Sequence, residues 1–299
     1  MAALSLSQLH PVPYSNLDAM ALNQLEPTNQ LDGVAETLMI TLYSRYVETQ
    51  RPDSLFQDPK AVEMAQGTDY NFDKYAKGWA SQLGVVVRVQ AYDRIVKTFL
   101  ETHPDAVVIS LGCGLCTRFL RVDNGSVRWY EVDFPEVIEL RRKFFVESDR
   151  YRFIAQSILD FAWIDQIQRT PNQPLLLIME GVAMYLNEAE NRSLMTQIQS
   201  RLTPATWMFD VLNQKSAKDS KRHDTVSKTN AEFKWGVNNS KTLEAWGAGI
   251  RLEDEVYYLT EFAKHPRRLP LWARYLSPIL MPIFKQSGRI LCFKLSQPG

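Results

Sequence analysis

Apolar residues follow two different patterns in the two parts of the chain. Up to about residue 104 they recur at helical spacing, which predicts helices at Ala35–Val47, Ala61–Met64 and Trp79–Leu100. Beyond it, short apolar runs of the kind found in buried strands alternate with helical patterns. Residues 1 to about 30 have little periodicity, so we expect an irregular arm there.

The alternation continues to the end of the chain and indicates the fold class. Strands are expected at Ala106–Leu111, Arg128–Val132, Tyr151–Ala155, Leu175–Met179, Thr206–Leu212, Val256–Leu259 and Arg289–Lys294. Helices are expected at Phe134–Phe145, Phe161–Ile167, Lys241–Trp246, Leu271–Phe284 and, after a capping box of Asn187 and Glu190, up to Leu202. Strands alternating with helices favour an α/β fold with a doubly wound, mostly parallel seven-stranded sheet that binds its ligand at the carboxyl ends of the strands.

A chain of 299 residues is compatible with one large domain. Within it we expect an N-terminal arm and helices at 1–104, a ligand-binding core at 105–212, a cap at 213–247 and closing strands with a helix at 248–299. The cap is expected to be an insertion over the edge of the sheet, because Gln214–Ser240 is charged and poor in aliphatic residues.

A turn with two glycines follows the first expected strand. Gly112 and Gly114 let the backbone approach a ligand closely, and the N–H groups that follow face the same place. The next strand leads to Asp133, 21 residues after Gly112, a spacing at which a carboxylate accepts hydrogen bonds from ribose hydroxyls. The sequence therefore indicates a nucleotide-binding site. An ordinary tight turn of an α/β sheet is the competing interpretation.

Composition limits the classes of partner. Lys plus Arg and Asp plus Glu both number 34, so the net charge is zero and favours neither nucleic acid nor an anionic membrane. A small molecule is the expected partner, and the oligomeric state stays open.

Three cysteines are too few for a disulfide framework and fit a reducing cytoplasm. No Lys or Arg precedes Arg45, which argues against a signal or transit peptide, and the apolar stretch Leu269–Phe284 contains an arginine and three prolines, which argues against a membrane span.

Two other uses of the glycine turn are weaker interpretations. A dinucleotide site for nicotinamide redox chemistry has a third glycine where this chain has Thr117. Cys113 and Cys116 form a C-x-x-C pair of the kind used in redox sites, but packing against the ligand is the favoured role in a sheet of this size. No metal is expected, because no second cysteine pair and no spaced histidines supply further ligands.

Four motifs follow one another between Gly112 and Gly236. They are Gly112-x-Gly114-Leu115-x-Thr117-Arg118, Glu131-x-Asp133-Phe134-Pro135, Glu180-Gly181-Val182-x-Met184-Tyr185-Leu186 and Phe233-x-Trp235-Gly236. In order and spacing they resemble those of the leucine carboxyl methyltransferase type of S-adenosylmethionine-dependent O-methyltransferases, which includes bacterial polyketide carboxyl methyltransferases.

The resemblance implies a class I methyltransferase fold with S-adenosyl-L-methionine as cofactor. Arg88 matches the arginine that binds the carboxylate of the methionine part, and Asp133 matches the acid that binds the ribose. The other implied cofactor residues are Gly112, Cys113, Gly114, Phe134, Ser157, Ile158, Glu180 and Gly181. Two positions depart from the family: Cys116 replaces the usual Asp of G-L-D-T-R, and Ser157-Ile158 replaces the usual Asp-Leu beside the adenine.

The expected reaction is methylation of a carboxylate on a small polyketide- or peptide-like acceptor. A carboxylic acid is ionised at neutral pH and needs no base, whereas a phenol, the alternative acceptor, needs one such as His223 or His265. Tyr185 and Trp235 are the expected walls of the acceptor pocket, which His223 is also expected to line. A non-catalytic S-adenosylmethionine-binding protein on the same fold is a further alternative, and a nicotinamide oxidoreductase is a more distant one.

Overall fold

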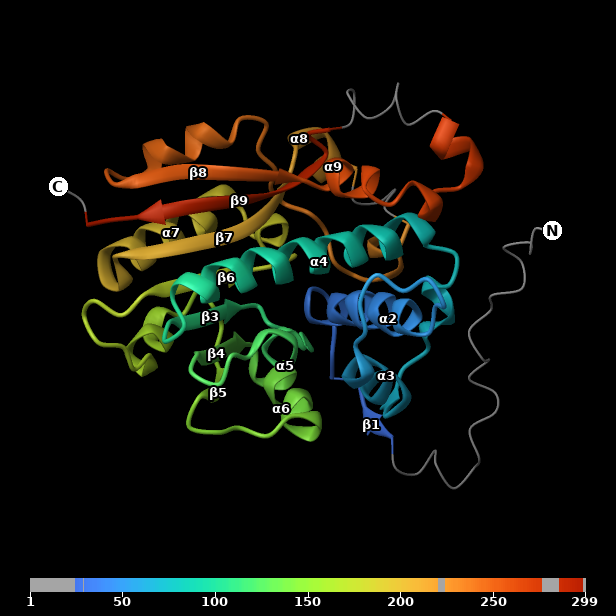
Figure 1. Cartoon of the computed structure of the whole chain (residues 1–299), viewed down its shortest axis with the longest axis horizontal. Helices are drawn as coiled ribbons and strands as arrows, with labels where there is room; N and C mark the ends of the chain where they lie inside the picture. Colours follow the sequence, from blue (N-terminus) through green and yellow to red (C-terminus); the bar gives the residue numbers. More distant parts are fainter. Residues whose placement is uncertain (1–24, 29, 220–223, 276–284, 298–299) are drawn as a thin grey trace.

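Seven strands form one sheet at the centre of the molecule. They are β3 Val107–Leu111, β4 Arg128–Asp133, β5 Tyr151–Ala155, β6 Leu175–Met179, β7 Ala205–Leu212, β8 Ile250–Tyr257 and β9 Gly288–Leu295. The computed structural model describes residues 25–28, 30–219, 224–275 and 285–297. The strands lie in the order β5-β4-β3-β6-β7-β9-β8 (Figure 1), and neighbours are parallel except where β9 pairs with β7 and β8. The expected α/β class with a mostly parallel seven-stranded sheet is confirmed.

Helices cover both faces of this sheet and one of its ends (Figure 1). The α-helices are α2 Leu38–Thr49, α3 Pro59–Gln66, α4 Trp79–Thr102, α5 Arg118–Val122, α6 Pro135–Phe144, α7 Glu188–Leu202, α8 Gln214–Lys218 and α9 Tyr258–Ala263. The 3-10 helices are η3 Ala35–Thr37, η4 Phe72–Tyr75, η5 Phe161–Gln166, η6 Ala183–Tyr185, η8 Val226–Lys228, η9 Ser240–Trp246 and η10 Pro266–Arg268. A separate parallel pair of short strands joins β1 Glu26–Pro27 to β2 Thr68–Asp69.

Alternate residues of the central strands enter two separate apolar cores. In β3, Val108 belongs to the core shared with α2 to α6, whereas Val107 and Ile109 belong to the core shared with α7, η5 and η9. Side chains of a strand point to opposite faces in turn, so a strand covered on both faces needs apolar residues at almost every position. This requirement explains the unbroken apolar run Leu175–Met179 of β6.

The carboxyl ends of the parallel strands face α2 and the first turns of α4 (Figure 1). From β3 the chain first adds β4 and β5 on one side and then returns to add β6 and β7 on the other. This change of direction creates a switch point between β3 and β6, and ligands of doubly wound sheets bind outside such a point. The glycine turn after β3 and Glu180 after β6 both lie there.

Most of the expected elements are confirmed within a few residues, including the capping box, in which the Asn187 side chain accepts from the N–H of Glu190 at 2.9 Å. One strand prediction is wrong: β8 begins at Ile250, before the expected start, and Leu259 belongs to α9. The acidic residues Glu253–Glu255 hide this strand in the sequence. They suit an edge strand, where charged side chains prevent pairing with other chains.

The expected cap begins with α8 and later meets the start of α4. Asp224 of this segment accepts hydrogen bonds from the hydroxyl and the N–H of Ser81, the latter at 3.4 Å. α4 has no capping side chain of its own, because Gly78 is its N-cap residue. A carboxylate at this end satisfies an N–H group of the first turn and interacts favourably with the helix dipole. A distant segment thus fixes the start of the helix that carries Arg88.

Three expected features lie outside the described residues: the N-terminal arm apart from its last few residues, His223, and residues 276–284 of the expected helix Leu271–Phe284. The division of the chain at residues 104, 212 and 247 stays a prediction. None of the described helices combines the length and the hydrophobicity that crossing a bilayer demands.

Candidate functional site

A cavity of about 790 Å³ lies at the carboxyl ends of β3, β4 and β6, with α2, α4, α9 and the segment around residue 225 as its walls. Sites for cofactors and small ligands commonly measure roughly 300 to 1,000 Å³. Most of the residues that the sequence predicted for the cofactor and the acceptor line it: Arg88, Gly112, Cys113, Gly114, Asp133, Phe134, Ser157, Ile158, Glu180, Gly181 and Tyr185.

The glycine turn needs its glycines for conformation and for space. Gly112 has a φ of 66° and Gly114 a φ of 50°, in the left-handed region that L side chains rarely adopt. A Cβ atom on Gly112 would lie 2.5 Å from Cγ2 of Val182, which belongs to the turn after β6. The two turns at the switch point therefore pack directly against each other, and only a residue without a side chain fits between them.

Two buried charged groups hold the turn through its backbone. Asp133 Oδ2 accepts from the N–H of Gly114 at 2.7 Å, and Arg141 donates to the Gly114 carbonyl at 2.9 Å and to the Cys116 carbonyl at 2.8 Å. Arg141 in turn pairs with Glu131 at 2.8 Å. Sequence reasoning had missed this role of Arg141, although an arginine in the helix after a strand that ends in Glu-x-Asp offers a signal.

Asp133, the predicted ribose-binding residue, lines the cavity and is also placed to respond to pH. Its carboxyl is almost fully buried, accepting from the N–H groups of Gly114 and, at 2.8 Å, of Phe134. Burial raises the pKa of Asp133 to about 6, although the two N–H groups act in the opposite direction. Each carboxylate oxygen keeps a second lone pair that can accept from a hydroxyl of a ligand.

Asp133→Asn is expected to weaken cofactor binding by about 1.5–3 kcal/mol, the range for hydrogen bonds to a charged group. The folded-state pKa is raised, so the contribution of Asp133 to folding stability is present at low pH and is lost as the pH rises through about 6. Ribose hydroxyls prefer the ionised form, so the affinity of the unsubstituted protein is expected to fall below about pH 6. Calorimetric titration with S-adenosylhomocysteine on both sides of pH 6 measures this, and an unchanged affinity in the variant would place the ribose elsewhere.

Glu180 is held between two arginines directly after β6. Arg88 donates to its Oε1 at 2.8 Å and Arg118 to its Oε2 at 2.6 Å, and only 13% of the Glu180 side chain is exposed. Burial acts to raise the pKa of Glu180, but the charges of Arg118 and Arg88 outweigh it and lower the pKa to about 2. Glu180 is therefore a buried anion at all physiological pH values. Glu180 is thus not merely a solvated acid at the end of a strand. Arg88, whose side chain is also 13% exposed, is likewise not a solvated arginine of a helix surface.

These three residues belong to a larger charge network of four arginines and four carboxylates. Arg118 and Arg121 both bind Asp93, at 2.8 and 2.6 Å. Arg121 and Arg45 both bind Asp58, at 3.2 and 2.8 Å. The charges balance, as buried charges must. The network consists of Arg45, Arg88, Arg118, Arg121, Asp58, Asp93, Glu180 and Asp210.

Asp210 closes the network on the side of α9. Its side chain is almost completely buried and accepts from the N–H of Gly181 at 2.6 Å, from the hydroxyl of Tyr258 at 2.6 Å and from Arg88 at 3.4 Å. The sequence contained a signal for this residue, because an aspartate interrupts the otherwise apolar end of strand β7. Asp210 and Tyr258 both line the cavity.

The groups at this end of the cavity fit an adenosyl amino acid. The glycine turn leaves room where a Cβ would collide, and Asp133 offers acceptors for a ribose. The guanidinium of Arg88 lies beside Gly181, because a Cβ on Gly181 would be only 3.2 Å from its nitrogens. A guanidinium suits a carboxylate because it donates two parallel hydrogen bonds. Ser157 and Ile158 also line the cavity, with the Ser157 hydroxyl accepting from the Leu159 N–H at 3.3 Å.

The far end of the cavity differs from the expected acceptor pocket in one wall. Tyr185 lines it and lies against Phe233, with ring centroids 5.4 Å apart, and Phe233 lines it as well. Trp235 does not line the cavity: it is buried against Trp246, 5.8 Å away, in the core of the other sheet face. Residues two positions apart share one side of a regular strand, so the different environments of Phe233 and Trp235 mean that this segment is not one. The N–H groups of Lys234 and Trp235 both donate to the carbonyl of Met184, at 2.7 and 3.2 Å.

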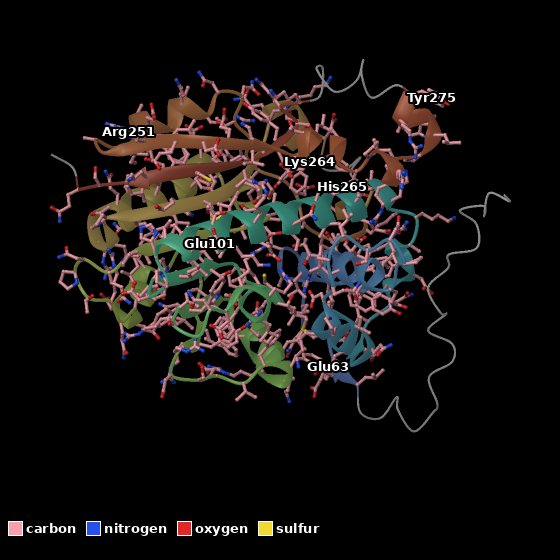
Figure 2. All side chains as sticks on the ribbon, viewed as in Figure 1. Glu63, Glu101, Arg251, Lys264, His265 and Tyr275 are labelled. Carbon is pink, nitrogen blue, oxygen red and sulfur yellow. The ribbon has the colours of Figure 1, made fainter. Side chains whose placement is uncertain are left out.

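No histidine is placed as a base in the described part of the cavity. His265 lies beside α4 (Figure 2). Its Nε2 is 2.9 Å from Gln90 Oε1, and the residue does not line the cavity. His223 is outside the described residues. Within the described ranges, no three His, Cys, Asp or Glu side chains gather in a way that could hold a metal ion.

Comparison with known proteins gives one family. The family model of leucine carboxyl methyltransferase matches residues 38–199. Tetracenomycin polyketide synthesis O-methyltransferase TcmP of Streptomyces glaucescens is 34% identical over 229 residues, which are 76% of this chain and 84% of that protein. The S-adenosyl-L-methionine-dependent methyltransferase dpfgK of Gibberella zeae is 26% identical over 261 residues, 78% of this chain and 85% of that protein.

Among solved structures, a DUF574 family protein of Streptomyces avermitilis is similar in fold, with a TM-score of 0.56 and 13% identity over 87% of this chain and 97% of that one. The family model covers more than half of the chain, including the glycine turn, Asp133 and the segment after β6. The fold, the cavity at the switch point and the sequence matches agree. The chain belongs to the leucine carboxyl methyltransferase family.

Proposed function

We propose that this protein transfers the methyl group of S-adenosyl-L-methionine to a carboxylate of a small polyketide- or peptide-like acceptor. Methyl transfer from this cofactor is the activity of its family and of its named relatives. The carboxylate and the acceptor class go further and are the proposal. The observation that carries it is the ammonium group of Lys234, which lines the cavity and has no ion-pair partner among the described residues.

Among the cations of the lining, Lys234 supports an anionic acceptor. The four arginines of the charge network line the cavity, and each is paired with a carboxylate. Lys234 also lines it, at an exposed position, and none of the ion pairs between described residues involves it. Its backbone N–H donates to the carbonyl of Met184 at 2.7 Å, which fixes the segment against the turn after β6. An ammonium group is thus available at the cavity for an acidic group of the acceptor.

The absence of a histidine from the described lining also favours a carboxylate over a phenol. Burial raises the pKa of Tyr185 to about 12, so its hydroxyl stays protonated at neutral pH and cannot accept a proton from a phenol. A carboxylic acid has a pKa near 4 and is already ionised, so it needs no proton acceptor.

The residues of this chain then act by binding and positioning. When bound, the cofactor supplies a methyl group that its sulfonium already activates. Asp133 and Arg88 hold the two ends of the cofactor, and Tyr185 and Phe233 exclude water from the acceptor side. Holding a nucleophile in line with its target can contribute roughly 7 to 11 kcal/mol to lowering the barrier, which makes a dedicated catalytic base unnecessary.

A panel of paired acceptors tests the proposal. Aromatic carboxylic acids and the phenols of the same ring systems are incubated with cofactor labelled in its methyl group. Carboxyl methylation gives methyl esters, which release labelled methanol on mild alkaline hydrolysis, whereas methyl ethers of phenols do not. We expect the label in the alkali-labile fraction. Label only in stable ethers would contradict the carboxylate, and no transfer to any acceptor despite cofactor binding would favour a non-catalytic binding protein.

Lys234→Met is expected to raise the KM for a carboxylate acceptor about three- to tenfold, equivalent to roughly 0.7–1.4 kcal/mol, because an exposed ion pair contributes modestly. The turnover number is expected to change little, since Lys234 contacts no reacting bond. Lys241→Met is the matched control, an exposed lysine of η9 that does not line the cavity. Lys234→Arg retains the charge and is expected to preserve KM. Equal KM values in both Met variants would remove Lys234 from the acceptor site.

A further inference from the structure

The two cysteines of the glycine turn are neighbours in space as well as in sequence. The N–H of Cys116 donates to the carbonyl of Cys113 at 3.0 Å, which closes a turn. The Cα atoms at the two ends of such a turn lie within about 7 Å of each other, and disulfides span Cα separations of about 4.4–6.8 Å. Both cysteines are free thiols, and both line the cofactor end of the cavity.

The two sulfurs differ in accessibility and surroundings. Cys116 is partly exposed to the cavity, and Arg118 donates a hydrogen bond to its Sγ at 3.6 Å. Cys113 is 6% exposed, and burial raises the pKa of its thiol well above the ordinary value. An oxidant that enters the cavity therefore meets Cys116 first, with a cation beside the sulfur, and Cys113 is the thiol placed behind it.

We propose that Cys113 and Cys116 form a thiol modification site, which a peroxide oxidises to a disulfide and which bound cofactor protects. Cys116 Sγ attacks one peroxide oxygen, the O–O bond breaks, and a sulfenic acid forms with release of one water. Cys113 Sγ then attacks that sulfur, the S–OH bond breaks, and the hydroxide leaves as a second water with the proton of the thiol. Two thiols are oxidised and one hydrogen peroxide is reduced to two waters.

The disulfide would act on the part of the site that accepts the cofactor, and this step rests on the proposed function. The S–S bond would cross the turn whose backbone Asp133 and Arg141 hold, and both cysteines line the cavity. Pulling them together changes the turn against which the cofactor packs. We therefore expect oxidation to weaken cofactor binding about tenfold or more, and the cofactor to slow oxidation.

Hydrogen peroxide treatment of the full chain tests this site. Cys292→Ser removes the third cysteine, which lies in strand β9, and leaves the pair as the only thiols. Intact mass is expected to fall by two hydrogen atoms with loss of both thiols, and dithiothreitol is expected to reverse the change. S-adenosylhomocysteine, added before the peroxide, is expected to preserve the thiols.

Titration calorimetry with S-adenosylhomocysteine before and after oxidation separates the two proposals. If the reduced protein does not bind S-adenosylhomocysteine, the proposed function is contradicted. The mass measurement then still tests whether Cys113 and Cys116 form a disulfide. A sulfinic acid on Cys116 beside a free Cys113 thiol, or a disulfide without loss of affinity, would overturn the inference. Cys113→Ser is expected to stop oxidation at the sulfenic acid of Cys116, trapped by dimedone. If this variant does not fold, peptide mapping of the oxidised, unsubstituted protein shows whether Cys113 and Cys116 are joined.

Discussion

Gly112→Ala is expected to lower the free energy of unfolding by about 2–5 kcal/mol and to abolish measurable cofactor binding. A left-handed conformation costs an L side chain about 1–2 kcal/mol, and forcing a methyl group into a packed site costs roughly 1–3 kcal/mol more. The new Cβ would lie 2.5 Å from Val182 Cγ2, so one of the two turns at the switch point has to move. Urea unfolding and calorimetry with S-adenosylhomocysteine measure the two effects.

Gly125→Ala is the matched control for this prediction. Gly125 has a φ of 81°, but a Cβ there meets nothing within 4 Å, so the variant has the conformational cost without the collision. Val182→Ala removes the two nearest atoms that Gly112→Ala would meet and leaves Val182 Cβ at an ordinary contact distance of 3.5 Å. Adding Gly112→Ala to Val182→Ala is therefore expected to cost only about as much stability as Gly125→Ala costs alone. Equal effects of Gly112→Ala and Gly125→Ala would mean that the two turns do not constrain each other.

Arg88→Met is expected to weaken cofactor binding about 100-fold, equivalent to roughly 3 kcal/mol, and to lower stability by a similar amount. The variant loses the guanidinium fork and leaves Glu180 and Asp210 short of one cation in a buried site. The lowered pKa of Glu180 contributes stability that is present above about pH 4.5 and is lost as the pH falls towards about 2. In Arg88→Met this loss in acid is expected to be smaller, because only Arg118 still lowers the pKa.

Arg94→Met provides the control on the same helix. The Arg94 side chain is 52% exposed and pairs with Glu261 at 3.1 Å, away from the charge network. Arg94→Met is expected to change neither the affinity for the cofactor nor the loss of folding stability in acid. Arg88→Lys keeps the charge without the fork and is expected to retain stability better than affinity. If Arg88→Met bound the cofactor as the unsubstituted protein does, the carboxylate of the methionine part would have another partner.

The central sheet and its site were predictable because their signals are local. An apolar run that stops at Gly112 and a second one that leads to Asp133 are visible in short windows, and parallel topology then brings both strand ends together. Arg88 and Glu180 were recognised through family motifs. Each of these four residues lies on the cavity.

The charge network was not predictable, because its pairs join residues far apart in the sequence. Arg88 and Asp210 are 122 positions apart, and Arg118 and Glu180 are 62 apart. A charged residue in an amphipathic helix has the same sequence pattern whether it faces solvent or a buried partner. The edge strand β8 was misplaced for the opposite reason, since its charged residues resemble those of a loop.

The link between Asp224 and Ser81 has a consequence for how the acceptor and the cofactor affect each other's binding. Asp224 and Thr225 line the cavity, and the helix that Asp224 caps carries Arg88, which lines it as well. If the acceptor binds beside Asp224 and the cofactor beside Arg88, as proposed, this link joins the two binding sites. An acceptor that displaces this segment would disturb the anchoring of α4, and one that presses it inward would strengthen it. The affinities for the two substrates are then coupled, and thermodynamic reciprocity requires each to change the other by the same factor.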